Sequence, residues 1–232
     1  MIKKNIVAVI AAAGIGKRVG GIVPKQYLTL LGKNIIEYSI QPFIDHPQVD
    51  SVIVSIAKND QWFKQLAVAK NRKIKIVEGG HERVDSVLSA LLVIDKKDYV
   101  LVHDAARPCI TREDIDKLIT KVFTSKQGAL LGSRVRDTMK RSNNNGLIVE
   151  TVERQQLWHA LTPQMFENGL LIDAINNAED KAKITDEASA MEMNGFPVSI
   201  VEGRSDNLKV TRQEDLKIAE LYLSQSINKD KV

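Results

Sequence analysis

Residues 6 to 26 carry the chemistry that is easiest to recognise in this sequence. Their apolar start, IVAVIAAA, predicts a buried strand, and the stretch that follows, GIGKRVGGIVPKQ, is rich in glycine and positive charge. Glycines let a backbone approach an anion closely, and Arg18 and Lys25 add cations, so this loop suits a triphosphate. Neither standard phosphate motif fits. Val19 replaces the third glycine of G-x-G-x-x-G, and Ile22 stands where a Walker loop needs lysine.

A second group of candidates stands where predicted strands end. The strand near 99–103 runs into DAARP, which places Asp104 at the carboxyl edge of a parallel sheet, where such folds bind ligands. One carboxylate with phosphate oxygens and water is a common way to hold Mg²⁺. The alternative is that Asp104 only caps its loop. The strand near 74–78 runs into EGGHERVDS, whose two glycines permit close backbone approach before Ser86.

Polar side chains late in the chain form a third and weaker group. Four of them have no evident structural use and could hold a phosphorylated second substrate. They are Arg154, Thr162, Thr185 and Lys209. Asp186 and Glu187 favour a helix N-terminus, a role that we expect above all of Glu187.

The composition limits the class of protein. At 232 residues and 44% hydrophobic content, the chain can form one large α/β domain. Its 33 basic and 29 acidic residues are interspersed, so we expect no nucleic-acid partner. A single cysteine, Cys109, excludes an intramolecular disulfide and a multi-cysteine zinc site, as is typical of the cytoplasm. The N-terminal apolar run is too short for a signal peptide or membrane span, so we expect a soluble protein.

Apolar, β-branched runs alternate with amphipathic stretches, which is typical of βαβ units around a mainly parallel sheet. The predicted strands are 6–12, 50–57, 74–78, 99–103 and 128–133, and the predicted helices are 34–44, 59–70, 82–94 and 112–125. Later elements are a helix after Pro163, a helix at 186–194, a strand at 198–202, a short LKV strand at 208–210 and a last helix to about Ser226. Thr111 and Thr211 each stand three residues before an acid and predict helix caps.

Residues 134 to 154 depart from this alternation. A polar turn, SNNNG, lies between RDTMKR and LIVETVER, and predicts a β-hairpin with its tip at 142–146. Such an insertion can be a dimerisation arm or an ordinary surface hairpin. The residues alone leave both interpretations open.

Seven segments, in order, closely resemble the conserved blocks of the 2-C-methyl-D-erythritol 4-phosphate cytidylyltransferases. They are AAAGIGKRVG…PKQY, VEGGHERVDSV, VLVHDAARPC, VRDTMKR, LWHALTPQMF, ITDEASAMEMNG and VEGRSDNLKVTRQEDL. The resemblance covers nearly the whole chain and implies a single Rossmann-like nucleotidyltransferase domain. It implies that CTP and methylerythritol phosphate react by direct in-line attack on the α-phosphate, with Mg²⁺ and without a covalent enzyme intermediate, in isoprenoid precursor synthesis.

The same resemblance implies roles for individual residues. Asp104 would serve Mg²⁺, and the catalytic groups would be Arg18, Lys25, Arg154 and Lys209. The CTP-binding residues would be Ala12, Ala13, Gly14, Gly80, His81, Ser86, Ala105 and Arg107, with His81 standing where relatives often have Asp. The second substrate would be held by Thr138, Arg154, Thr162, Thr185 and Lys209. In the family the hairpin crosses a two-fold axis, so a homodimer with exchanged arms is implied, in which Arg154 and Thr162 come from the partner subunit.

Other activities fit the residues less well. Ribitol 5-phosphate cytidylyltransferase is a sister activity on the same fold, but ITDEAS, WHALTPQMF and the DTMKR arm favour the methylerythritol enzyme. A non-catalytic nucleotide-binding domain would lack the cations or the carboxylate, whereas Arg18, Lys25, Asp104 and Lys209 are all present. A dehydrogenase is disfavoured by the missing third glycine.

Overall fold

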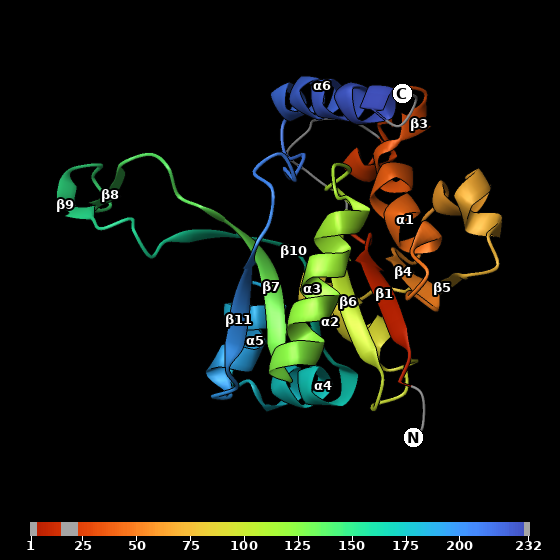
Figure 1. Ribbon diagram of the computed structural model, residues 1–232, viewed down its shortest axis with the longest axis horizontal. Coiled ribbons are helices and arrows are strands. Elements are labelled where there is room, and N and C mark those ends of the chain that lie inside the picture. Colours follow the sequence, from red (N-terminus) through yellow and green to blue (C-terminus); the bar gives the residue numbers. More distant parts are fainter. Residues whose placement is uncertain (1–3, 15–22, 230–232) are drawn as a thin grey trace.

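A mixed, mostly parallel sheet forms the centre of the molecule in this computed structural model (Figure 1). The structure describes residues 4–14 and 23–229, and within them the main sheet has seven strands in the order β11-β7-β10-β6-β1-β4-β5. Their bounds are β1 Ile6–Ala11, β4 Ser51–Ile56, β5 Ile74–Glu78, β6 Tyr99–Asp104, β7 Gly128–Arg134, β10 Trp158–Glu167 and β11 Val198–Glu202. The strands predicted at the starts of the βαβ units are confirmed.

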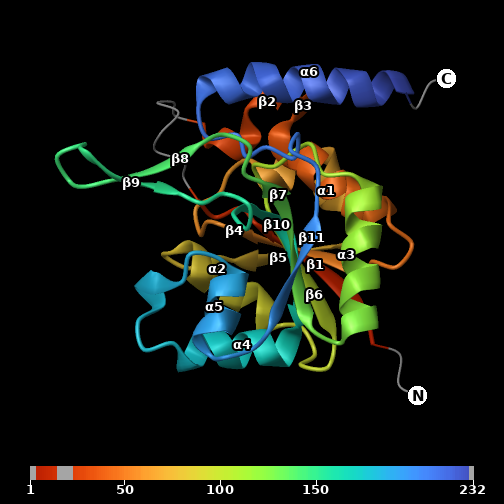
Figure 2. The same cartoon turned by 60° about the vertical axis from the view of Figure 1, so that its left-hand side comes forward.

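Helices cover both faces of this sheet, which explains why the central strands are apolar without alternation. Their bounds are α1 Ile35–Asp45, α2 Arg83–Leu91, α3 Arg112–Ser125, α4 Asn168–Asn177, α5 Glu187–Met193 and α6 Gln213–Lys229. One buried cluster joins the sheet to α1 and α3, and a second joins it to α2, α4 and α5 (Figure 2). A smaller cluster packs α6 over α1 and the short hairpin β2 (Thr29–Leu30) and β3 (Lys33–Asn34). No helix in the described part of the chain is both long and apolar enough to cross a bilayer.

The helix predicted at 59–70 is wrong. This segment forms two short 3₁₀ turns, η3 Phe63–Gln65 and η4 Ala67–Lys70, separated by an extended Leu66. Asp60 accepts hydrogen bonds from the backbone N–H groups of Trp62 and Phe63, which turns the chain locally instead of starting a regular helix. The fully buried Phe63 then fixes this turn against the core.

The structure also corrects the elements predicted around residue 163. Residues 158–167 form β10, which runs antiparallel between β6 and β7, and the helix begins only at Asn168. Met165 packs in the cluster on one face of the sheet and Phe166 in the cluster on the other, so a strand between two helix layers buries successive residues without the alternation that reveals an exposed strand. The LKV strand is likewise absent, since residues 208–210 have no regular structure.

The predicted threonine cap is confirmed at Thr111, whereas the hydroxyl of Thr211 is a donor to Asp215 and α6 begins two residues later, at Gln213. Thr111 accepts from the backbone N–H of Asp114 and closes a capping box on α3. At the start of α6, Asp215 rather than the predicted Glu214 accepts from the N–H and hydroxyl of Thr211 and from the N–H of Arg212. The acid therefore acts one residue later than the capping pattern predicts.

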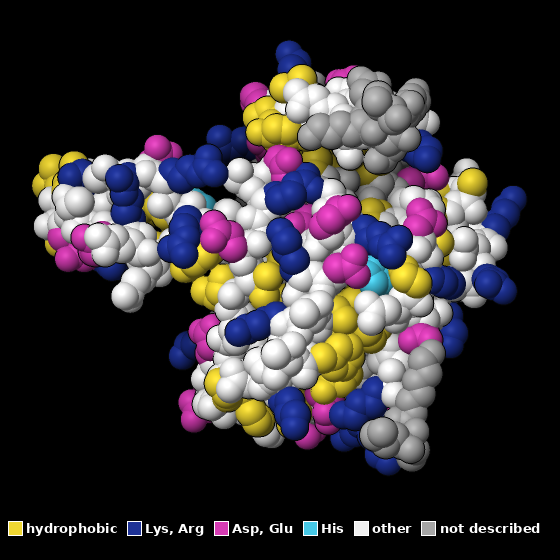
Figure 3. Space-filling view, in the orientation of Figure 1, with side chains coloured by type: hydrophobic (Ala, Val, Ile, Leu, Met, Phe, Trp, Pro, Cys, Tyr) yellow, Lys and Arg dark blue, Asp and Glu magenta, His cyan; other side chains and the backbone are white. Residues whose placement is uncertain are grey.

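The predicted hairpin is confirmed as an arm that projects from the body (Figure 1). It consists of β8 Met139–Ser142 and β9 Ile148–Val152, which pair only with each other. Residues 136–151 are all exposed, and Leu147, Ile148 and Val149 are each more than 60% exposed at its end. Figure 3 shows hydrophobic side chains gathered at this tip, whereas acidic and basic side chains are interspersed on the same face of the body.

Candidate functional site

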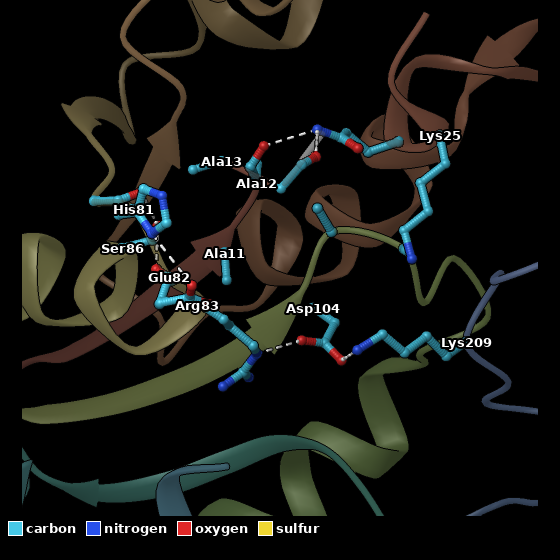
Figure 4. A pocket seen from close by; sticks show the side chains of 15 residues that line it. Ala11, Ala12, Ala13, Lys25, His81, Glu82, Arg83, Ser86, Asp104 and Lys209 are labelled. Atoms are coloured by element: carbon cyan, nitrogen blue, oxygen red, sulfur yellow. Dashed lines mark hydrogen bonds and ion pairs between the residues drawn. The ribbon is translucent and has the colours of Figure 1, made fainter. Parts of the chain in front are cut away.

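The carboxyl ends of β1, β5 and β6 surround a pocket of about 280 Å³ (Figure 4). Most of the residues that the sequence predicts to bind a nucleotide line it. They are Ala12, Ala13, Gly14, Lys25, Gly80, His81, Ser86, Asp104 and Ala105, together with Lys209, predicted for the second substrate. Arg18 lies outside the described residues.

The first wall of the pocket is the backbone that follows β1. Ala12 donates its N–H to Ser55 O at 2.9 Å, which continues the sheet pairing by one residue. Gln26 is 4% exposed, and its side-chain amide donates to Ala12 O at 2.8 Å and Gly14 O at 3.1 Å. Gln26 therefore shapes the start of the glycine-rich loop. Sequence reasoning missed it, although it closes the PKQ segment next to the predicted Lys25.

The turn between β5 and α2 forms the second wall, and it requires its glycines. A Cβ at Gly79 would lie 2.5 Å from Ala13 Cβ, and one at Gly80 would lie 2.3 Å from Asp85 Cβ. Gly79 therefore packs against Ala13 of the first wall and Gly80 against Asp85 of its own wall, with no room for a side chain at either glycine. Ser86 Oγ donates to Glu82 O at 3.0 Å, so its hydroxyl also tightens this turn.

Asp104, at the end of β6, is the electrostatic centre of the pocket. The residue is 6% exposed. Its Oδ1 accepts from Arg83 Nε at 3.1 Å, and its Oδ2 lies 2.9 Å from Lys209 Nζ and 3.5 Å from Arg107 Nε. Burial alone would raise the pKa of Asp104, but these three cations outweigh it and hold the pKa well below its usual range. Asp104 is therefore ionised at any physiological pH.

A hydrogen-bond chain fixes Asp104 from behind. Its N–H donates to Thr162 Oγ1 at 3.1 Å, and that hydroxyl lies 3.0 Å from His103 Nδ1. His103 Nε2 lies 3.2 Å from Arg107 O, so this nitrogen carries the ring proton and Nδ1 accepts from Thr162. Burial lowers the pKa of His103 to about 4, which keeps the ring neutral and this order of donors intact. Sequence reasoning missed His103, a polar residue inside the apolar strand VLVHD.

Thr162 accordingly occupies a different place from the one that the resemblance implies. It is 4% exposed, and its hydroxyl is engaged by His103 and Asp104 of its own chain. Its neighbourhood makes it a support for the pocket of its own subunit. The contact with the second substrate across a dimer, which the resemblance implies for Thr162, stays a prediction.

Arg107 lies behind the pocket and fastens the segment that carries Lys209. Its Nη1 donates to Asn207 O at 2.8 Å, and the fully buried Asn207 donates its side-chain amide to Thr162 O at 2.8 Å. The N–H of Val210 donates to Ala106 O at 2.8 Å. These bonds hold the irregular stretch 203–211 against the end of β6, so Lys209 reaches Asp104 although its own segment is neither strand nor helix.

Arg83 is a further pocket residue that sequence reasoning missed. Besides Asp104, it contacts Glu187 at the start of α5, with Nη1 to Oε1 at 2.6 Å and Nη2 to Oε2 at 3.2 Å. Burial alone would lower the pKa of Arg83, but the two carboxylates outweigh it and raise the pKa. No local pattern reveals this pair, because 104 residues separate its members.

Three predicted second-substrate residues lie elsewhere in the chain. Arg154 lines a separate hollow of about 420 Å³ at the base of the arm and donates to Arg136 O. Thr138 is exposed on the arm, and Thr185 is exposed just before α5. A single chain therefore brings Lys209 to the pocket without Arg154 or Thr138.

The donor set around Asp104 fits a metal only when the ligand supplies most of the coordination. Within residues 4–14 and 23–229, no group of three or more His, Cys, Asp or Glu side chains is placed so that it could hold a metal ion. Asp104 is an ionised carboxylate on the pocket wall, and each of its oxygens has more than one lone pair. One such carboxylate suits Mg²⁺ that arrives with nucleotide phosphates.

Comparison with known proteins gives a consistent result. Residues 6–225 match the family described as 2-C-methyl-D-erythritol 4-phosphate cytidylyltransferase. Proteins of that name from Aeromonas hydrophila subsp. hydrophila and Shewanella pealeana are 54% and 50% identical to this chain. The matches cover 97% and 96% of this chain and 92% and 97% of the relatives.

Solved structures agree with the sequence matches. A crystal structure of 4-diphosphocytidyl-2C-methyl-D-erythritol synthase superposes with a TM-score of 0.83 at 32% identity, over 96% of this chain and 100% of that one. The Francisella tularensis 2-C-methyl-D-erythritol 4-phosphate cytidylyltransferase superposes with a TM-score of 0.80 at 37% identity, over 94% and 100%.

Proposed function

The chain belongs to the family of 2-C-methyl-D-erythritol 4-phosphate cytidylyltransferases and is a nucleotidyltransferase, and we propose that its reaction takes place in the pocket around Asp104. The reaction joins CTP to 2-C-methyl-D-erythritol 4-phosphate and releases pyrophosphate, giving 4-diphosphocytidyl-2-C-methyl-D-erythritol for isoprenoid precursor synthesis. One observation carries this assignment of the site. An ionised carboxylate held between Arg83 and Lys209 faces a pocket that is also lined by the segment after β1 and by the glycine turn between β5 and α2.

CTP binds along the carboxyl ends of β1 and β5. The backbone of Ala12 to Gly14 is fixed by Gln26 and faces the pocket, which suits it to contact the nucleotide. Gly80, His81 and Ser86 line the pocket at the turn between β5 and α2, where they are placed to recognise the base; Figure 4 shows His81 and Ser86 there. The His81 side chain is 93% exposed, so its backbone is the better placed group for base recognition.

The chemistry requires positioned charge rather than a nucleophilic side chain. The phosphate of the second substrate attacks the α-phosphorus of CTP in line, and pyrophosphate leaves. Lys25 and Lys209 line the pocket, and cations placed in advance stabilise the negative charge that develops on the transferring phosphate and on the leaving group. Arg18 is assigned the same role from its place in the glycine-rich loop.

Mg²⁺ accompanies the triphosphate, with Asp104 as its protein ligand. When bound, the ion neutralises phosphate charge. Asp104 is suited to hold it because the surrounding cations keep the carboxylate ionised, and because Thr162 and His103 fix its backbone.

A second copy of the chain completes the site. Residues 136–151 of the arm are exposed and include an apolar tip, and the arm carries Thr138, with Arg154 at its base. In a homodimer with exchanged arms, Arg154 and Thr138 of one subunit reach the pocket of the other and bind the second substrate.

The single buried cysteine and the absence of any disulfide partner suit work in the reducing cytoplasm.

Pyrophosphate release tests the reaction directly. The protein is incubated with CTP and Mg²⁺, and methylerythritol phosphate is compared with ribitol 5-phosphate. We expect rapid release with methylerythritol phosphate only. Faster release with ribitol 5-phosphate would transfer the substrate assignment to the sister activity, and no release with either would contradict catalysis.

A further inference from the structure

Glu187 is a buried carboxylate at a position where the sequence predicts only a favourable charge at a helix N-terminus. The residue is 3% exposed, and both its oxygens accept from Arg83, at 2.6 and 3.2 Å. Such a bidentate ion pair fixes the plane of a guanidinium as well as its position. The capping role belongs to the neighbouring Asp186, which accepts from Ser189 N at 2.9 Å. The carboxylate of Glu187 therefore needs another explanation.

Arg83 transmits this fixed orientation to the pocket. One N–H of each terminal nitrogen donates to Glu187, and the Nε–H, on the side of the guanidinium, donates to Asp104 Oδ1 at 3.1 Å. Figure 4 shows Arg83 approaching Asp104 from one side and Lys209 from the other. Three separate elements, α5, α2 and β6, thus meet through three side chains.

Arg83 could bind Asp104 in another way if Glu187 did not hold it. Arginine prefers to bind a carboxylate with two parallel N–H groups. Without Glu187, Arg83 would be free to clasp both oxygens of Asp104, or to leave it altogether. The first arrangement would occupy the oxygens that a nucleotide-bound cation needs, and the second would release the direction of the carboxylate.

We propose that Glu187 is a positioning residue for cytidylyl transfer, which holds Arg83 so that one N–H orients Asp104 and the carboxylate stays open to the pocket. This inference rests on the proposed function of the Asp104 pocket. Glu187 itself does not line the pocket, so it acts through Arg83.

Kinetics of Glu187→Gln, which keeps the size of the side chain and removes its charge, test the proposal. We expect kcat to fall about 10- to 100-fold, as when a partner that orients an active-site ligand is removed. KM for either substrate should change little. When Glu187→Gln is added to Asp104→Asn, kcat should fall by less than about twofold relative to Asp104→Asn alone, because Glu187 acts through Asp104.

Asp98→Asn is the matched control. Asp98 is also a buried carboxylate, 9% exposed, but it binds Asn5 at the opposite end of β6. Its loss should leave kcat unchanged. A fall in kcat equal to that of Glu187→Gln would overturn the proposal, as would an undiminished effect of Glu187→Gln in the Asp104→Asn background.

Arg83→Lys provides a second test of the positioning role, which can be used if Glu187→Gln does not fold. Lysine retains the positive charge next to Asp104 but has no fork for Glu187. We expect the same loss of kcat, and wild-type kcat would overturn the proposal.

A crystal structure of Glu187→Gln separates this inference from the proposed function. Arg83 Nε should have left its place 3.1 Å from Asp104 Oδ1. An Arg83 that keeps this contact overturns the positioning role whatever the enzyme does. A wild-type protein that releases no pyrophosphate overturns the proposed function instead.

Discussion

The pocket around Asp104 and the projecting arm differ in what holds their functional side chains in place. Asp104, Arg83 and Arg107 are each fixed by at least two partners from the same chain, most of them buried. On the arm, Thr138 is exposed, and the side chain of Arg154 at its base donates to the carbonyl of Arg136. The fold of a single chain thus sets one half of the proposed active site, and in our proposal a second subunit supplies the other half.

The largest expected effect comes from the half that the chain itself fixes. Lys209→Ala removes the cation 2.9 Å from Asp104, and we predict a fall in turnover of about 10²- to 10³-fold. The Lys209 side chain is 37% exposed, so the melting temperature should stay close to that of the wild type. Steady-state kinetics and calorimetry check both parts. Lys217→Ala, on α6, is the control that should leave turnover unchanged.

A somewhat smaller effect is predicted from the arm. Arg154→Ala should lower turnover about 100-fold while CTP affinity, measured by isothermal titration calorimetry, stays unchanged, because Arg154 contacts only the second substrate in this account. Unchanged turnover at saturating CTP would remove Arg154 from the site. Arg141→Ala, which loses an exposed ion pair with Glu150 on the same arm, provides the matched control.

Thr162→Val decides whether Thr162 supports the pocket of its own chain or binds the second substrate. Its hydroxyl is buried against His103 and Asp104, so we predict a loss of about 1–3 kcal/mol in the free energy of unfolding and a loss of turnover of about tenfold. Thr138→Val, on the exposed arm, should not change stability. A rise in KM for the second substrate without any loss of stability would instead return Thr162 to the role implied by the resemblance.

The last prediction, which leaves turnover aside, concerns the pH dependence of stability. Burial lowers the pKa of His103 to about 4, whereas an unfolded histidine titrates near 6.5, so the unfolded chain binds more protons between these values. Stability should therefore fall as the pH drops from about 6.5 to 4, by up to about 3 kcal/mol from this residue. The free energy of unfolding, measured with urea at several pH values, should depend less steeply on pH for His103→Gln than for the wild type. An unchanged slope would contradict the assignment, and His81→Gln, at an exposed site, is the control.

The features that could be predicted from the sequence are those that residues close together in the chain determine. The strand before the glycine-rich loop, the Thr111 cap and the arm arise from neighbouring residues, and all three are confirmed. Asp104 could be singled out because it ends an apolar run. The antiparallel strand β10 could not, because its residues are buried by two helix layers that only the complete fold supplies.

The supporting residues of the site show the same limit more sharply. Glu187 reads locally as a helix-start acid, and only the folded chain reveals that its partner is Arg83. Arg107 follows Asp104 by three residues, and the sequence predicts it next to the nucleotide, yet its buried guanidinium contacts Asp104 and the carbonyl of Asn207. Side chains with several plausible uses are decided by tertiary contacts, which no local pattern contains.

The division of the site between two subunits can be tested by mixing variants. Subunits carrying Lys209→Ala and subunits carrying Arg154→Ala are given different affinity tags, co-expressed, and purified as mixed dimers. One pocket of each mixed dimer then has an intact Lys209 and receives an intact Arg154 from its partner, so we predict about half of the wild-type turnover per dimer. A mixed dimer no more active than either variant alone would contradict a shared active site.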